Sequence, residues 1–259
     1  MNPDFTIVPA NPGDIPVLAK ISHDAFVGDA QTEMKSHGRT PFNMGEHMLQ
    51  SLPDTIQSPK STSRVIKVVQ IETGLIMGFC IWGFRGVGPP VFPTEPALID
   101  EESQLVDRAK SQRDTPSPET TTPGPGATEG HDPIQRLNDL TGKDFRDWMD
   151  KIMPEKARCM YVIGLYVSPA FQRQGVGSAL LLWGTRLADS HGVFAWVHSS
   201  HGAWRVYERA GFKTARTLEV DLDEYAPVPA PLDRYEGGKW GKYVFRYMVY
   251  GNASDTDFS

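Results

Sequence analysis

The chain has 259 residues, with 26 Lys and Arg against 32 Asp and Glu, a formal net charge of −6 and two cysteines. This length holds one large or two small domains. The excess of acidic residues disfavours nucleic acid as a partner, because binding to its phosphates needs a cluster of basic side chains. The N-terminus lacks a signal-peptide pattern, and no apolar run approaches the roughly 18 residues that span a bilayer. We expect a cytoplasmic protein, with a nuclear location left open, that binds neither nucleic acid nor membrane.

The first ninety residues predict strands and helices in alternation. The segments are a strand at residues 5–8, a helix at 15–26 with Asp14 as its cap, a short helix at 45–52, and a hairpin of strands 64–71 and 75–82. Cys80 lies in the second strand of this hairpin. We expect Cys80 and Cys159 to be buried thiols, because a chain without a secretion signal gives a disulfide no oxidising compartment.

The composition changes abruptly after the hairpin. Between Ser111 and Pro133 there is no Val, Ile, Leu, Met, Phe, Tyr or Trp. Such a segment cannot bury enough apolar surface to offset the entropy of ordering it, so we predict a mobile loop there, preceded by a short solvated helix at 101–110. Residues 84–139 are then an insertion, which either covers the substrate side or extends from the surface. It belongs to one domain over residues 1–259, with a tail at 251–259 that is expected to fray.

The remainder of the chain again alternates between helix and strand. The expected elements are a helix at 137–152, a strand at 160–167, a helix that ends before Gly192, a strand at 193–197, a helix at 203–210, and strands at 214–222 and 243–250. Combined with the first half, this order predicts an α/β fold with a mixed central sheet and helices on both faces.

The segment Gln172-Arg173-Gln174-Gly175-Val176-Gly177 stands between the strand at 160–167 and the helix that follows. Two glycines at a helix entrance let the backbone approach a ligand closely, and the first-turn amides have no partner inside the helix. An anion such as phosphate is the natural occupant. The spacing is neither the dinucleotide fingerprint nor a P-loop, and most Gly-x-Gly pairs that stand alone are simple turns.

Residues 160–220, taken together, resemble the acetyl-CoA-binding half of the GNAT N-acetyltransferase superfamily, in particular its small fungal-type enzymes. The family pattern is [Gln/Arg]-x-x-Gly-x-[Gly/Ala] after the fourth strand, then Ala-x-x-x-Tyr-x-x-x-Gly-Phe, and residues 203–212 match the second part. The resemblance implies a mixed, mostly antiparallel sheet. It also implies direct transfer of an acetyl group from acetyl-CoA, as co-substrate, to an amine. The long connection at 84–139 departs from the family, in which this link is short.

The resemblance also implies which residues bind acetyl-CoA. The pyrophosphate would lie against backbone amides, with polar side chains beside it and a charge-assisted contact from Arg173. The residues concerned are Gln172, Arg173, Gln174, Gly175, Val176, Gly177 and Ser178. Main-chain groups of Leu165, Tyr166 and Val167 would bind the pantetheine arm and stabilise the oxyanion, although these three residues also fit a plain buried strand. Ser200 stands where the wider family often has asparagine and would touch the pantetheine.

Tyr207 falls at the family position of the tyrosine that faces the CoA sulfur. With an ordinary pKa near 10 it is protonated at neutral pH and can protonate a thiolate of pKa ~8.5. The alternative is a core residue, because Ala203, Val206 and Ala210 share its helix face.

The general base is not evident from the sequence. His198 has a suitable intrinsic pKa, yet His198-Ser199-Ser200 replaces the Glu-Ala-Ser of fungal-type relatives, which leaves a carboxylate base in doubt. His198 therefore remains open between a base and a packed histidine. His191, His198 and His201 lack any zinc-site spacing, so no metal site is expected.

The sequence thus predicts an acetyl-CoA-dependent acyltransferase that acts on an amine, in first place a small molecule. A protein or peptide N-acetyltransferase is the second interpretation, although the insertion at 84–139 disfavours an open peptide groove. A non-catalytic acyl-CoA sensor is the third, and the presence of Tyr207 disfavours it. The sequence leaves open the acceptor, the acyl chain preference, and whether the protein is a monomer or a homodimer.

Overall fold

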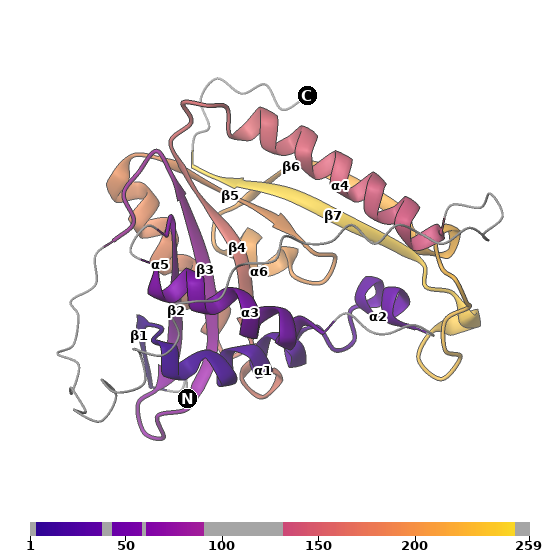
Figure 1. Cartoon of the computed structure of the whole chain (residues 1–259), viewed down its shortest axis with the longest axis horizontal. Coiled ribbons are helices and arrows are strands. Elements are labelled where there is room, and N and C mark those ends of the chain that lie inside the picture. Colours follow the sequence, from indigo (N-terminus) through magenta and orange to yellow (C-terminus); the bar gives the residue numbers. More distant parts are fainter. Residues whose placement is uncertain (1–3, 38–42, 59–60, 91–131, 252–259) are drawn as a thin grey trace, which may run out of the picture. The chain divides into compact units, whose positions relative to one another are not determined.

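The computed structural model describes residues 4–37, 43–58, 61–90 and 132–251 (Figure 1). These residues belong to one compact unit, which comprises residues 1–90 and 132–259. The short helix expected at 101–110, the loop expected at 111–133 as far as residue 131, and the tail from residue 252 lie outside the described residues. In the part of the chain that is described, no helix combines the length and the apolar character needed to cross a membrane.

Seven strands form one sheet in the order β1-β2-β3-β4-β5-β7-β6. Neighbouring strands run antiparallel except β4 and β5, which are parallel. The mixed, mostly antiparallel sheet is therefore confirmed. The strands are β1 (Phe5–Pro9), β2 (Ser63–Gln70), β3 (Ile76–Arg85), β4 (Cys159–Val167), β5 (Phe194–Ser199), β6 (Lys213–Asp221) and β7 (Lys242–Tyr250).

The helices cover both faces of this sheet. They are α1 (Ile15–Ala25), α2 (Ala30–Ser36), α3 (Met44–Gln57), α4 (Pro133–Ile152), α5 (Val176–His191) and α6 (Trp204–Arg209). In Figure 1, α1, α3 and α4 lie in front of the strands and α5 and α6 lie behind them. Alternation along β3 explains the two layers. Phe79 and Ile81 pack against α1 and α3, whereas Trp82 points the other way, onto Gly184 of α5.

Local signals set the ends of the long helices. The Asp132 side chain accepts a hydrogen bond from the Ile134 amide (3.2 Å), and Pro133 occupies the first turn of α4. The helix α5 ends at Gly192, whose φ of 61° is left-handed, and the Val193 amide returns to the Ala188 carbonyl. The predicted stop at Gly192 is confirmed.

Two local predictions differ from the structure. Asp14 does not cap α1 with its side chain. Its Oδ2 accepts from the Asn11 amide (2.8 Å) and from Lys67 Nζ (2.5 Å), which ties the entrance of α1 to β2. The second helix, expected at 45–52, runs over the whole of α3, and α2 precedes it without having been predicted. The helix α2 is only seven residues long, too short for its periodicity to be recognised.

The interior contains the two thiols that were expected. Cys80 and Cys159 are both buried and free, as predicted. Burial raises the pKa of each thiol, that of Cys159 to about 11, so neither is a reactive thiolate at neutral pH.

Candidate active site

The parallel strands β4 and β5 separate at the centre of the sheet. Their pairing begins at Cys159 with Phe194 and ends at Val162 with Val197, although β4 continues to Val167. A bulge in β4 marks the same point. Ile81 pairs with Gly164 and Trp82 with Val162, which leaves Ile163 as an extra residue, 52% exposed in the middle of the strand. Main-chain groups of residues 163–167 therefore face a gap on the β5 side.

The turn between β4 and α5 lies at the end of this gap. Gly175 has a φ of 88°, a conformation that favours glycine, and Arg173 has a φ of 60°, which is uncommon for a residue with a side chain. Gln172 Nε2 donates to the Val167 carbonyl (3.3 Å) and Gln174 Nε2 to the Ala170 carbonyl (2.9 Å), so two side chains brace the turn. The first amides of α5 point out of the helix because they have no acceptor within it.

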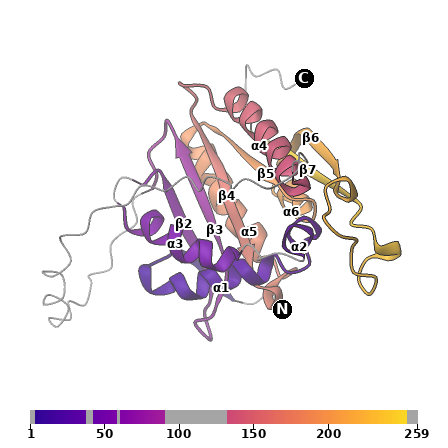
Figure 2. The same cartoon turned by 45° about the vertical axis from the view of Figure 1, so that its right-hand side comes forward.

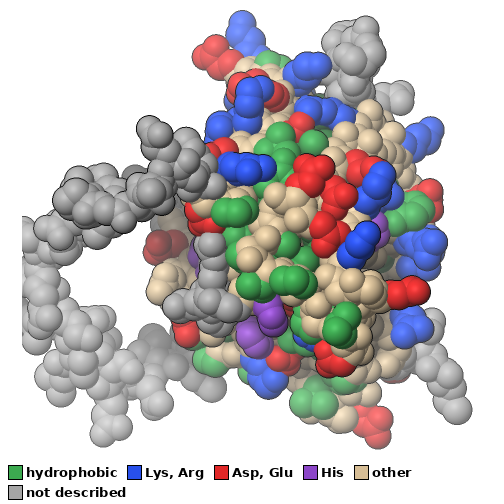
Figure 3. Space-filling view, turned by 90° about the vertical axis from the view of Figure 1, so that its right-hand side faces the viewer, with side chains coloured by type: hydrophobic (Ala, Val, Ile, Leu, Met, Phe, Trp, Pro, Cys, Tyr) green, Lys and Arg blue, Asp and Glu red, His purple; other side chains and the backbone are tan. Residues whose placement is uncertain are grey.

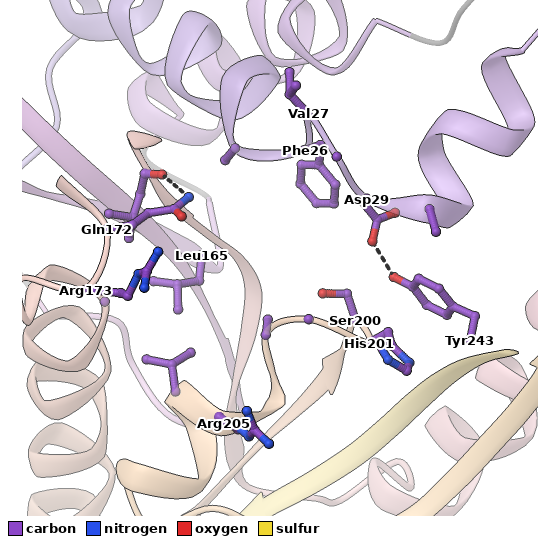
Figure 4. Close-up of a pocket in the computed structure, with 18 of the residues that line it drawn as sticks. Phe26, Val27, Asp29, Leu165, Gln172, Arg173, Ser200, His201, Arg205 and Tyr243 are labelled. Carbon is purple, nitrogen blue, oxygen red and sulfur yellow. Dashed lines mark hydrogen bonds between the residues drawn. The ribbon is translucent and has the colours of Figure 1, made fainter. Parts of the chain in front are cut away.

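A pocket of about 1020 Å³ joins the separated strands to the α5 entrance. Four parts of the chain line it: the link between α1 and α2, the end of β4 with the following turn, the β5–α6 region, and the start of β7 (Figure 4). The structure brings together eight of the residues predicted from the sequence to form the site. They are Leu165, Val167, Gln172, Arg173, Gly175, Gly177, Ser178 and Ser200. Tyr166, Gln174, Val176, His198 and Tyr207 lie outside this lining.

Tyr207 of α6 is buried, with 5% of its surface exposed. Its ring meets Phe212 edge-on, with the ring centres 5.8 Å apart. Burial raises its pKa well above the ordinary value, and the neighbouring Cys80 and Tyr166 add to the shift. The hydroxyl therefore stays protonated throughout the neutral range. This is expected of a proton donor and of a core residue alike, so it does not distinguish the two roles.

His198 lies in an aromatic stack on the α4 side of the sheet. Its ring is 4.6 Å from that of Tyr247 and 5.3 Å from that of Phe145, between centres. Among the described residues, no hydrogen-bond partner reaches its buried Nε2. Burial lowers the pKa of His198 to about 4, against a smaller opposing effect from Asp144. These surroundings favour the packed histidine over the base, because an imidazole with so low a pKa is a weak proton acceptor.

The pocket is charged at both ends, with opposite sign. Arg173 and Arg205 lie at the end away from Asp29 (Figure 4), and Arg209 of α6 also lines the pocket. Asp29 lies at the other end and is the single acid among the described lining residues. Lys242 is also part of the lining, but its ammonium group pairs with Glu219 at 2.6 Å.

Sequence reasoning missed Asp29 and its partner Tyr243. Asp29 caps α2, and its Oδ1 accepts a hydrogen bond from the Tyr243 hydroxyl (2.9 Å) in β7 (Figure 4). An aspartate directly after Gly28 is a recognisable capping signal. Nothing local indicates Tyr243, which is 214 positions away.

The chain is similar to known proteins in the sequence of one segment and in its overall fold. Residues 142–212 match the family described as the acetyltransferase (GNAT) family. No curated protein sequence matches the chain. A solved structure of a mosquito arylalkylamine N-acetyltransferase-like protein, 5b, is 16% identical, with a TM-score of 0.52 over 95% of this chain and 99% of the other.

Two further solved structures have the same fold as this chain. One is a putative arylalkylamine N-acetyltransferase 7 of the yellow fever mosquito Aedes aegypti, 15% identical, with a TM-score of 0.52 over 95% of this chain and 86% of the other. The other is a mutant agmatine N-acetyltransferase in its apo form, 14% identical, with a TM-score of 0.51 over 95% and 98%. The chain therefore has the GNAT fold, and its residues 142–212 match the GNAT acetyltransferase family.

Proposed function

We propose that the protein is an N-acetyltransferase that transfers an acetyl group from acetyl-CoA to a small amine. One observation carries the proposal: the separation of β4 and β5 and the N-terminus of α5 open into the same pocket. A thioester with a pyrophosphate in its carrier needs these two features side by side. The solved structures that share the fold bear the names of enzymes acting on arylalkylamines and agmatine, which supports an amine as acceptor.

The residues at the α5 entrance fit the pyrophosphate of acetyl-CoA. A Cβ on Gly177 would stand 3.4 Å from Val206 and 3.6 Å from Val167, so glycine keeps a space open between α6 and β4. The amides of Val176, Gly177 and Ser178 supply donors for an anion. Arg173, Arg205 and Arg209 supply positive charge on the same side of the pocket.

Acetyl-CoA, when bound, supplies an activated acetyl group as a thioester. The amine nitrogen attacks the carbonyl carbon, a C–N bond forms, and the C–S bond then breaks. Exposed main-chain amides of β4 beyond Val162 stabilise the oxyanion. Tyr207, which lies outside the pocket lining, would give its proton to the departing thiolate and regain one from water, and the amine would lose its proton to water.

The two alternative functions, a peptide N-acetyltransferase and a non-catalytic acyl-CoA sensor, can be distinguished from acetyl transfer to a small amine. A peptide acceptor needs an open groove, and the panel of acceptors below tests whether peptides are used. A sensor would bind acetyl-CoA without turnover. Tyr207 stands at the family position of the proton donor, which favours an enzyme over a sensor.

The binding site is tested by glycine variants at the two ends of α5. Gly175→Ala and Gly192→Ala both force a side chain into a left-handed conformation, and neither new methyl group has a neighbour within 4 Å. They share the backbone strain, about 1 kcal/mol, yet only Gly175 lies in the pocket. We expect calorimetry to show weaker binding of acetyl-CoA for Gly175→Ala and for Gly177→Val. Gly192→Ala should bind like wild type, and unchanged affinity in folded Gly177→Val would contradict the site.

The reaction is tested by release of the CoA thiol from acetyl-CoA. The panel contains diamines, aryl amines, amino acids and peptides, and mass spectrometry identifies the acetylated product. Turnover of small amines with no turnover of peptides supports the proposal. Binding of acetyl-CoA without acetylation of any acceptor would favour the sensor.

A further inference from the structure

Asp29 stands isolated at the end of the pocket away from the arginines. Among the described residues of the lining it is the single acid, and its carboxylate is firmly held. Oδ2 accepts from the Thr32 amide (3.0 Å) and the Thr32 hydroxyl (2.8 Å), and Oδ1 accepts from Tyr243 (2.9 Å). A carboxylate offers about four acceptor positions, so the group retains capacity on Oδ1 for a further donor from the pocket.

Aromatic side chains accompany this carboxylate. Phe26 lies beside Asp29 on one side and Tyr243 on the other (Figure 4), and Trp240 also lines the pocket. A carboxylate beside aromatic rings suits an organic cation, which gains from both. Lys35 is a cation of the protein itself that could compete with a ligand for Asp29, since the charge of Asp29 acts on its ammonium group. The two nevertheless form no ion pair within the described residues.

Several contacts fix the helix α2, which carries Asp29 at its N-terminus. Glu33 accepts hydrogen bonds from Arg234 (2.8 Å) and Tyr235 (2.8 Å), which lie before β7. Met34 is fully buried in a cluster that includes Trp240 and Tyr243. Figures 1 and 2 both show α2 beside the β7 end of the sheet. With the Asp29–Tyr243 bond, these contacts join α2 to the β7 region and hold Asp29 in place at the pocket.

The charge of Asp29 suits a cation other than the reacting nitrogen. An amine attacks a thioester in its neutral form, and a carboxylate that favours the ammonium form would retard that attack. A second cationic group on the same molecule has no such conflict. It can stay charged at Asp29 while the reacting nitrogen reaches the gap between β4 and β5.

We propose that the acceptor is a small amine with a second cationic group, an ammonium or a guanidinium, and that Asp29 binds this second group. This inference rests on the proposed acetyl transfer and specifies its substrate class. It predicts that selectivity lies in the second charge, because a monoamine leaves the Asp29 carboxylate without a cationic partner.

The test compares 1,4-diaminobutane with n-butylamine, which has the same carbon chain and one nitrogen fewer. We expect wild type to use the diamine with a kcat/KM roughly 10- to 100-fold higher. Asp29→Asn keeps the helix cap and should bring the ratio of the two kcat/KM values to within about 3-fold of one. Asp24→Asn is the control, since Asp24 pairs with Lys20 outside the pocket lining, and it should keep the preference.

Equal use of both amines by wild type would overturn the inference and leave acetyl transfer intact. An equal loss for both amines in Asp29→Asn would also overturn it, since Asp29 would then act on structure alone. If no amine is acetylated, the proposed function fails. Calorimetry of the two amines with saturating CoA then decides the inference separately, and a diamine preference that Asp29→Asn abolishes would still support the cation site.

Discussion

At the scale of single residues, burial shifts the pKa values of two candidate catalytic groups in opposite directions. A tyrosine and a histidine both favour their neutral form when they are buried, which raises the pKa of Tyr207 and lowers that of His198. The shift keeps the Tyr207 hydroxyl protonated at neutral pH and also makes it a weaker acid. The same effect makes His198 a weaker proton acceptor, which disfavours the role of general base that the sequence left open for it.

Replacing Tyr207 by phenylalanine removes the proposed acid and keeps the ring. We expect turnover to fall roughly 100-fold with acetyl-CoA affinity close to wild type. The defect should shrink at low pH, where solvent protonates the thiolate more readily. Tyr250→Phe is the matched control, because its hydroxyl bonds to Asp189 at the surface. Normal turnover by Tyr207→Phe would return Tyr207 to a purely structural role.

His198 also predicts how stability depends on pH. The unfolded chain takes up a proton near pH 6.5, but folded His198 does so only near pH 4. Stability is therefore lost as the pH falls from about 6.5 to 4. Relative to His198→Phe, which keeps the stacked ring, wild type should lose about 2 kcal/mol of unfolding free energy between pH 7 and pH 5. Urea titrations at the two pH values measure this. Parallel pH curves for both proteins would refute the buried neutral histidine.

At the scale of elements, α4 is attached to the sheet through one buried carboxylate. Asp144 accepts from the Tyr247 hydroxyl of β7 (2.6 Å) and pairs with Arg216 of β6. Trp148 and Ile152 of the same helix are buried against Tyr247 and its neighbours. The helix was predicted at 137–152, and its first turn, capped by Asp132, was not. Its polar attachment was not predictable, because Arg216 and Tyr247 come later in the chain.

Asp144→Asn should destabilise the fold by about 2–3 kcal/mol, because it leaves the Arg216 charge without its partner. Chemical denaturation measures the loss. Asp147→Asn changes a carboxylate three residues along the same helix, which pairs with Lys143 at the surface. Its unfolding free energy should stay essentially that of wild type. Equal effects of the two substitutions would show that Asp144 contributes no more than a surface ion pair.

At the scale of the molecule, the candidate site is assembled from parts that are far apart in sequence. The pocket combines the α1–α2 link with residues around 165–178, 200–209 and 240–243. On the face that includes α2 and the β7 end, acidic and basic side chains are interspersed (Figure 3). The opposite charges at the two ends of the pocket are therefore a local arrangement. We retain the proposal of a single domain over residues 1–259 that carries an insertion at 84–139.

Deleting residues 111–131 and joining the ends with a short flexible linker should leave the melting temperature within about 2 °C of wild type, because the segment lacks large apolar side chains. The deletion must stop before Asp132 and Pro133, which begin α4. Differential scanning calorimetry tests the expectation. A larger drop would show that the segment packs, and loss of turnover with unchanged stability would make it part of the substrate site.

By itself the sequence determined the order of the strands and of the helices other than α2, the glycine turn at 172–177 and the burial of both cysteines. These features follow from local periodicity and from the backbone conformations that glycine permits, which are readable within a few residues. Only the tertiary structure decided that Asp29 meets Tyr243, and that His198 lies in an aromatic stack and not in the pocket. Such contacts join residues that approach one another only when the sheet closes, and the burial that sets their chemistry is a property of the packed fold.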